Sequence, residues 1–180
     1  MWFQNKFVPN NFMKRIGLLS DTHGFLHPRI FPFFEKVDEI WHAGDIGSIE
    51  TADSLAAFKP LKAVYGNIDG HEIRVVHPLH QRFMCEDVDV WITHIGGYPG
   101  HYERVVKPEI STNSPDLFIC GHSHILKVIF DKKLNFLHMN PGAAGNKGFH
   151  VVCTALRFVI DGKDIRDLEI WEMKRKEIVL

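Results

Sequence analysis

Five short apolar runs, each followed by an Asp, Asn or His, constrain the fold of this chain more than any other feature. The first spans about 15–20 and leads directly into Asp21. The runs recur at intervals of about 25 residues, a little less than the ~30 residues of a full βαβ unit. Short apolar runs bounded by Gly, Pro or Asp are typical of buried strands. The recurrence therefore predicts an α/β fold with parallel strands.

The first half of the chain alternates between strand and helix in this interpretation. We expect strands at 15–20, 39–43 and 61–65, with helices at 29–37 and 49–58 between them. Ser48 is the expected N-cap of the second helix.

The second half turns into β-structure. We expect extended pieces at 72–76 and 82–86 and buried strands at 88–93 and 116–120. A helix is expected at 98–107, ended by Pro108. Two hairpins should follow, at 126–139 and 151–173, joined by a Gly-rich turn at 141–148. No linker interrupts the pattern, so we expect a single domain over 13–180, preceded by an N-terminal extension at 1–12.

Composition excludes several classes of protein. The chain has 180 residues, 45% of them hydrophobic, and a net charge of −1, which suits one globular domain and gives no basic surface for nucleic acid. No apolar run approaches the roughly 20 residues of a membrane span, and 1–12 lacks the features of a signal peptide. Cys85, Cys120 and Cys153 lie in apolar runs, so we expect core residues in a reducing cytoplasm.

The polar residues that follow the strands predict a metal site. Parallel strands present their carboxyl ends at one edge, where ligands bind in open α/β folds. The side chains expected to meet there are two carboxylates, one amide and four imidazoles: Asp21, His23, Asp45, Asn67, His94, His122 and His124. Seven ligands are too many for one tetrahedral ion but suit two ions about 3.5–4 Å apart that share a bridging carboxylate. Mixed oxygen and nitrogen ligands favour Mn²⁺, with Fe, Ni or Zn as alternatives.

The same motifs carry a family resemblance. The ordered set Asp21-x-His23, Gly44-Asp45, Gly66-Asn67, His94 and Gly121-His122-Ser123-His124 resembles the calcineurin-like metallophosphoesterases over roughly 15–160. The resemblance implies a four-layer α/β/β/α sandwich and hydrolysis of a phosphate ester by a hydroxide that bridges two metals. It also implies a role for each ligand: Asp21, His23 and His124 hold the first metal, Asp45 bridges, Asn67, His94 and His122 complete the second, and Asp45, Asn67 and His94 serve catalysis.

One position departs from the family pattern. Many members carry a His after the Gly-Asn pair, where it assists the leaving group, but this chain carries Ile68. The compact bacterial and archaeal phosphodiesterase-like subgroup, which also resembles the retromer scaffold subunit of eukaryotes, often lacks that His. The chain length and the Asn-Pro-Gly turn at 140–142 are similar to that subgroup. The resemblance therefore favours a phosphodiesterase acting on diesters with good leaving groups.

Several roles stay open at the level of sequence. His71 or His101 is a candidate phosphate contact, His42 is expected to pack behind the site, and Asp69 either orients a ligand imidazole or closes a turn. The rival function is a non-catalytic metal-binding scaffold for protein partners, and a single-metal regulatory binder is a third. The enzyme is favoured because scaffolds of this kind tend to lose ligands. A small phosphoester is the expected partner, and homo-oligomerisation is left open.

Overall fold

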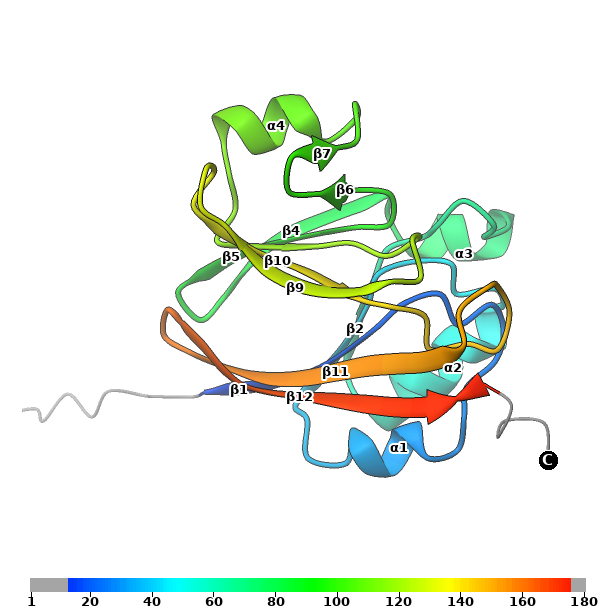
Figure 1. Ribbon diagram of the computed structural model, residues 1–180. Coiled ribbons are helices and arrows are strands. Elements are labelled where there is room, and N and C mark those ends of the chain that lie inside the picture. The colour runs from blue at the N-terminus through cyan, green and yellow to red at the C-terminus, as the bar shows by residue number, and fades with distance from the viewer. Residues whose placement is uncertain (1–12, 176–180) are drawn as a thin grey trace, which may run out of the picture.

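Two five-stranded sheets lie face to face at the centre of the molecule (Figure 1). The computed structural model describes residues 13–175, so the extension expected at 1–12 lies outside the described residues. The first sheet contains, in spatial order, β12 (Asp164–Lys174), β11 (Val152–Asp161), β1 (Lys14–Leu19), β2 (Glu39–His42) and β3 (Leu61–Ala63). The second contains β4 (His80–Cys85), β5 (Val88–Thr93), β8 (Leu117–Ile119), β10 (Phe136–Pro141) and β9 (Leu126–Asp131).

Each sheet has a parallel centre flanked by antiparallel strands. In the first sheet β1, β2 and β3 run parallel, and β11 and β12 add an antiparallel hairpin beside β1. In the second sheet β5, β8 and β10 run parallel, with β4 and β9 antiparallel at the two edges. The carboxyl ends of both parallel sets lie at the same end of the sandwich, and the loops that follow these strands gather there (Figure 1).

The main hydrophobic core fills the space between the sheets. Leu18 of β1 lies opposite Trp41 of β2 and Leu156 of β11, and all three side chains are fully buried in this layer. The second sheet contributes Val90 and Ile92 from the facing side. Burying each such side chain stabilises the fold by about 1.5–3 kcal/mol, so a one-residue slip of β1, which would turn its apolar face outward, is strongly disfavoured.

Helices cover the outer face of each sheet. α1 (Ile30–Phe33) and α2 (Ile49–Phe58) lie outside the first sheet, and α4 (Lys107–Thr112) lies outside the second (Figure 1). Gly17 of β1 permits this packing, because a Cβ there would lie 2.8 Å from the Phe34 ring. The expected four-layer α/β/β/α sandwich and the single domain are confirmed. No helix among residues 13–175 is long and apolar enough to cross a membrane.

Most of the predicted elements are confirmed. α2 spans the expected residues, and its N-cap Ser48 accepts a hydrogen bond from the Thr51 amide at 3.3 Å. β5 has the expected bounds, and both predicted hairpins form, as β9–β10 and β11–β12. The helix expected at 29–37 is only the four-residue α1. Cys85, Cys120 and Cys153 are free and buried.

The extended piece predicted at 72–76 is wrong, because α3 (His71–Val76) occupies it. Its β-branched residues favour a strand, but only Ile73 is buried, against Ile46 of the loop after β2. The Arg74 side chain also donates to the carbonyls of Gly66, Asn67 and Asp69, which anchors the turn. The packing of Ile73 on a distant segment and the hydrogen bonds of Arg74 to the preceding turn together override the local strand preference.

The helix predicted at 98–107 is also wrong. The two-residue strands β6 (Gly97–Tyr98) and β7 (His101–Tyr102) pair there around Pro99-Gly100. Gly100 has a φ of +88°, the conformation that a Pro-Gly turn of type II requires. The nearby helix, α4, begins at Lys107 and contains Pro108 in its first turn, where no intrahelical N–H is needed.

Candidate metal centre

The strand ends that carry the predicted ligands meet at one end of the sandwich. Asp21, Asp45 and Asn67 follow β1, β2 and β3 of the first sheet, whereas His94 and His122 follow β5 and β8 of the second. The sequence argument placed these ends on one sheet edge. The convergence instead requires two sheets, stacked so that both parallel sets point the same way.

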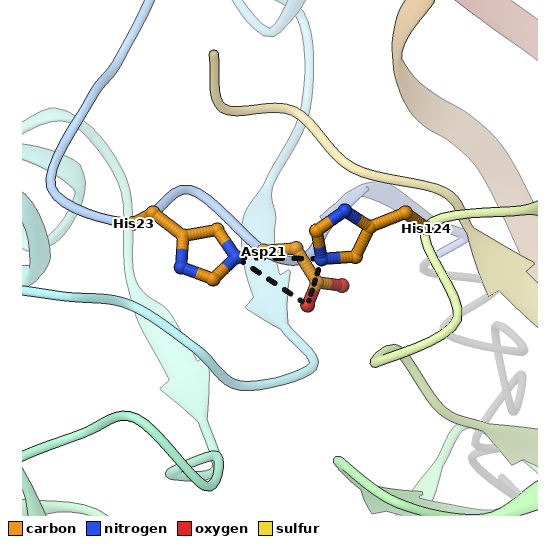
Figure 2. A group of neighbouring side chains, drawn as sticks. All are labelled: Asp21, His23 and His124. Atoms are coloured by element: carbon orange, nitrogen blue, oxygen red, sulfur yellow. Dashed lines mark hydrogen bonds and ion pairs between the residues drawn. The ribbon is translucent and has the colours of Figure 1, made fainter. Parts of the chain in front are cut away.

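The first ligand group consists of Asp21, His23 and His124 (Figure 2). The Nε2 atoms of the two imidazoles are 3.4 Å apart, and Asp21 Oδ1 lies 3.2 Å from His124 Nε2. Two nitrogens that bind one tetrahedral ion at about 2.1 Å lie about 3.4 Å apart. Asp21 Oδ1 is buried and accepts no hydrogen bond from the described residues. A buried carboxylate oxygen without a donor is costly, and a cation at this point satisfies it.

The second ligand group consists of Asp45, His94 and His122. His94 Nδ1 lies 2.8 Å from the carbonyl oxygen of Ala43, which only accepts, so this nitrogen carries a proton. His94 Nε2 then faces Asp45 Oδ1 at 3.2 Å and the Asn67 amide oxygen at 3.1 Å. With the ring neutral, three lone pairs point at one another. A shared cation relieves this arrangement, either a metal ion or a proton on His94.

The pKa values reflect the same need for positive charge. Burial lowers the pKa of His94, but the carboxylates of Asp45 and Asp21 outweigh it and raise that pKa overall. Burial opposes ionisation of Asp45, yet hydrogen bonds from His94 and from the Ile68 amide bring its pKa below the usual range. In the absence of metal, a proton on His94 therefore supplies the charge that the carboxylates require.

Asp45 lies between the two groups. Its Oδ1 faces His94 Nε2 at 3.2 Å and its Oδ2 faces His23 Nε2 at 3.9 Å. One carboxylate that presents its two oxygens to two ligand groups has the geometry of a bridging ligand. The residues present therefore fit a pair of divalent ions.

The backbone at the ligands is unusual. Positive φ values are uncommon for residues other than Gly. Among residues 13–175, eight such residues occur, and five of them are predicted ligands: Asp21, His23, Asp45, His122 and His124, with φ from 49° to 68°. Backbone strain of this kind costs of order 1 kcal/mol per residue and tends to concentrate at functional sites. Hydrogen bonds between neighbouring strand ends maintain this backbone conformation, including the one from Asp21 N–H to Gly44 O at 2.9 Å.

Two residues behind the ligands hold the loops in place. Asp69 accepts hydrogen bonds from the amides of Ile46, Gly47 and Gly66 at 2.7–3.1 Å, so of its two predicted roles it fills the turn role. His42 is fully buried, 2.9 Å from the Thr22 hydroxyl, and burial lowers its pKa to about 4. It packs behind the site, as expected.

The two candidate phosphate contacts lie apart from the ligands. His71 begins α3 and lines a 360 Å³ pocket with Gly47 and Ser48. His101 is exposed in β7, and its ring centroid lies 5.1 Å from that of Tyr98. Within the described part of the chain, neither makes a hydrogen bond or ring contact with any of the seven predicted ligands, so their roles stay predictions.

The sequence argument missed His150. Its Nδ1 lies 3.2 Å from His124 Nδ1, and its Nε2 lies 2.9 Å from the carbonyl oxygen of Gly145. His150 stands in an irregular loop and not at a strand end, so the pattern that found the other histidines could not find it. The turn expected at 141–148 does lie near the site, because the Gly145 amide donates to the Asp21 carbonyl at 3.1 Å.

Two pockets border the centre. One, of about 350 Å³, is lined by Asn67, His94, Tyr65 and Arg74 among others. The other, of about 220 Å³, includes Ser123, which stands between two predicted ligands, together with residues such as Tyr98, Lys127 and His138. The first pocket contains two predicted ligands in its lining, and the second includes the residue between His122 and His124.

Comparisons with known proteins agree with this geometry. Residues 13–163 match the family model of the calcineurin-like phosphoesterase superfamily domain. A protein of Methanothermobacter thermautotrophicus named "Probable metallophosphoesterase" is 29% identical over 135 residues, covering 71% of this chain and 76% of the relative.

Solved structures show the same fold. Vacuolar Protein Sorting 29 from Cryptosporidium parvum aligns with a TM-score of 0.68 at 17% identity, over 91% of this chain and 100% of that one. A structure described as a novel archaeal phosphodiesterase aligns with a TM-score of 0.62 at 21% identity, over 88% and 99%. The chain belongs to the calcineurin-like phosphoesterase superfamily, a family of hydrolases that act on phosphate esters with divalent metal ions.

Proposed function

We propose that the protein is a phosphodiesterase with two divalent metal ions in its centre. The observation that carries the proposal is the pair of ligand groups with Asp45 between them, together with the buried Asp21 Oδ1 that lacks a donor among the described residues. Two bound ions would lower the pKa of a water molecule and neutralise charge on the phosphoryl oxygens. We expect Mn²⁺ as the metal, with Fe, Ni or Zn as alternatives.

Residues around the ions provide hydrogen-bond donors and a positive charge for the substrate. Asn67 faces His94 with its amide oxygen, and among residues 13–175 its NH₂ group has no acceptor, so this group can donate to a phosphoryl oxygen. Ser123 accepts hydrogen bonds from the Asn140 side chain at 3.1 Å and the Ile125 amide at 3.3 Å, which leaves its own proton free. Lys127 lines the same pocket as Ser123, with its ammonium 4.1 Å from the Tyr98 ring centroid. These donors suit the oxygens of a small phosphoester.

Ile68 determines which leaving groups can depart. Its side chain is 48% exposed and its amide donates to Asp45, so this apolar group borders the centre and supplies no proton. A leaving oxygen must then depart without a general acid from this position. We therefore infer a preference for diesters with good leaving groups, and we place the enzyme in the cytoplasm because its three cysteines are free and buried.

The second candidate is a non-catalytic scaffold. β9 is an edge strand whose Val128, Ile129 and Phe130 are exposed, and an apolar edge is a template for pairing with another chain. The structural neighbours include Vacuolar Protein Sorting 29 proteins. The same edge leaves homo-oligomerisation open for an enzyme as well.

Metal analysis combined with a diester assay tests the proposal. The purified protein is loaded with Mn²⁺ near pH 7.5, dialysed and analysed for bound metal, and hydrolysis of bis(p-nitrophenyl) phosphate is followed by absorbance. We expect two ions per chain, turnover, and loss of both on treatment with a chelator. Trace metal after loading contradicts the metal centre, whereas two bound ions without turnover of any phosphoester favour the scaffold.

A further inference from the structure

We propose that His150 is a positioning residue that fixes the tautomer of His124, so that His124 Nε2 presents a lone pair to the first metal. The inference rests on the metal centre proposed above. His150 lies in the loop before β11, and its ring centroid lies 5.1 Å from that of His124 with the two planes at 74°. The two Nδ1 atoms are 3.2 Å apart, within hydrogen-bond distance.

The direction of each hydrogen bond follows from the groups involved. The Gly145 carbonyl oxygen only accepts, so His150 Nε2, 2.9 Å away, carries the proton. The Cys153 thiol donates to the same oxygen at 2.9 Å, and its sulfur lies 3.5 Å from His150 Nε2. Because the thiol proton is already used, the sulfur can only be a second acceptor for the proton on Nε2. In a neutral ring, His150 Nδ1 then holds the lone pair. His124 Nδ1 must be the donor to it, because one of two facing nitrogens has to supply the proton.

The tautomer of His124 determines which of its nitrogens can bind the first metal. With its proton on Nδ1, a neutral His124 has its lone pair on Nε2. That atom lies 3.2 Å from Asp21 Oδ1 and 3.4 Å from His23 Nε2, at the centre of the first ligand group (Figure 2). A main-chain carbonyl thus determines, through His150, which nitrogen of His124 is available for ligation.

The loop is built to hold His150 in this position. Gly148 has a φ of +122°, and a Cβ at this residue would lie 2.5 Å from His124 Nδ1. On the other side, the Gly145 amide donates to the Asp21 carbonyl, and a Cβ on Gly145 would collide with the carbonyl oxygen of Thr22. The loop therefore contacts the backbone of one ligand and the ring of another. Neither approach leaves room for a side chain.

The tautomers of His94 and His124 are set in different ways in the two ligand groups. His94 donates its Nδ1 proton directly to the Ala43 carbonyl, so its tautomer needs no intermediary. For His124, the acceptor that the described residues provide for Nδ1 is His150. Loss of His150 should consequently affect the first metal and spare the second.

Three variants separate this role from a general effect on the loop. His150→Leu removes the acceptor, while His150→Asn can place its amide oxygen close to the position of the lost Nδ1. Phe149→Leu is the matched control, since Phe149 is the fully exposed neighbour in the same loop. Removing an outer hydrogen-bond partner of a ligating His typically costs 10–100-fold in metal affinity.

The experiment reads out tautomer and metal binding, and does not depend on turnover. In Zn²⁺-loaded, ¹⁵N-histidine-labelled protein, long-range ¹H–¹⁵N NMR should show His124 protonated on Nδ1, and His150→Leu should increase the fraction of His124 that is protonated on Nε2 and not bound to metal. Competition titrations with Zn²⁺ should show one of two sites weakened 10–100-fold in His150→Leu, a smaller loss in His150→Asn, and no change in Phe149→Leu.

Two results would overturn the proposal. One is an Nε2-protonated His124 in the wild-type protein, which can be measured even if His150→Leu fails to fold. The other is a folded His150→Leu that binds both Zn²⁺ ions as tightly as the wild type does. If wild-type protein has the expected tautomer and binds metal but hydrolyses no phosphoester, the proposed function fails and the role of His150 stands.

Discussion

At the scale of single residues, a change at Asp45 should have the largest effect on metal binding, because this residue faces both ligand groups. Asp45→Asn replaces one ligand oxygen with an NH₂ group that cannot bind a cation. We expect turnover to become undetectable and metal analysis to show that both ions are held more weakly. His101→Ala is the comparison, because His101 is exposed and contacts none of the predicted ligands among the described residues. Equal losses of activity in the two variants would contradict the bridging role.

Ile68 offers a second test at this scale. Since its side chain is 48% exposed, a His there does not disturb the core. A positioned general acid contributes about 10²–10⁴-fold, and an unoptimised one should reach the low end at most. A nitrophenolate leaves unaided, whereas a ribose oxygen needs a proton. We therefore expect Ile68→His to raise kcat/KM for 2′,3′-cyclic nucleotides relative to bis(p-nitrophenyl) phosphate. An unchanged ratio, in folded protein with full metal content, would mean that position 68 does not face the leaving group.

At the scale of elements, Asp69 joins the loops after β2 and β3. It accepts from the amides of Ile46, Gly47 and Gly66, so Asp69→Ala leaves three donors in or near the core without their acceptor. We expect the free energy of unfolding to fall by about 2–4 kcal/mol, together with weaker metal binding, because these loops carry Asp45 and Asn67. Ser48→Ala is the control: it removes only the cap of α2, costs about 1 kcal/mol and leaves metal binding intact. Urea unfolding and metal titration of both variants check this, and equal effects on metal binding would refute the link.

At the scale of the whole molecule, buried histidines make stability depend on pH. Burial lowers the pKa of His42 and of His138 to about 4, so the unfolded chain binds more protons than the folded one between about pH 6.5 and pH 4. The free energy of unfolding therefore falls as the pH drops through this window, by up to about 1.4 kcal/mol per pH unit for each group. His94, whose pKa is raised, acts in the opposite direction but is a single group.

Urea unfolding of chelator-treated protein at several pH values measures this slope. His138→Met removes one of the histidines whose pKa burial lowers, so it should reduce the slope, whereas Ser48→Ala, which removes no titratable group, should leave it unchanged. A slope that is zero or reversed between pH 6.5 and 4.5 would contradict the buried, neutral state of these histidines.

The sequence by itself predicted the candidate ligands and determined most of the strands. Each buried strand is a continuous apolar run that stops at a polar residue, so its end is visible without the fold. The N-cap of α2 and the two hairpins were also predictable, because capping and tight turns depend on residues a few positions apart.

Only the tertiary structure decided how these pieces form a site. It distributes the strand ends over two stacked sheets, makes 71–76 helical by packing Ile73 in a cluster with Ile46, and brings His150 against His124. It also sets the positive φ of the ligands, which cross-strand hydrogen bonds maintain. In each case the deciding contact joins segments that are separate along the chain. Local propensity carries no information about such contacts, which is why the sequence predicted the ligands but not the loop that orients them.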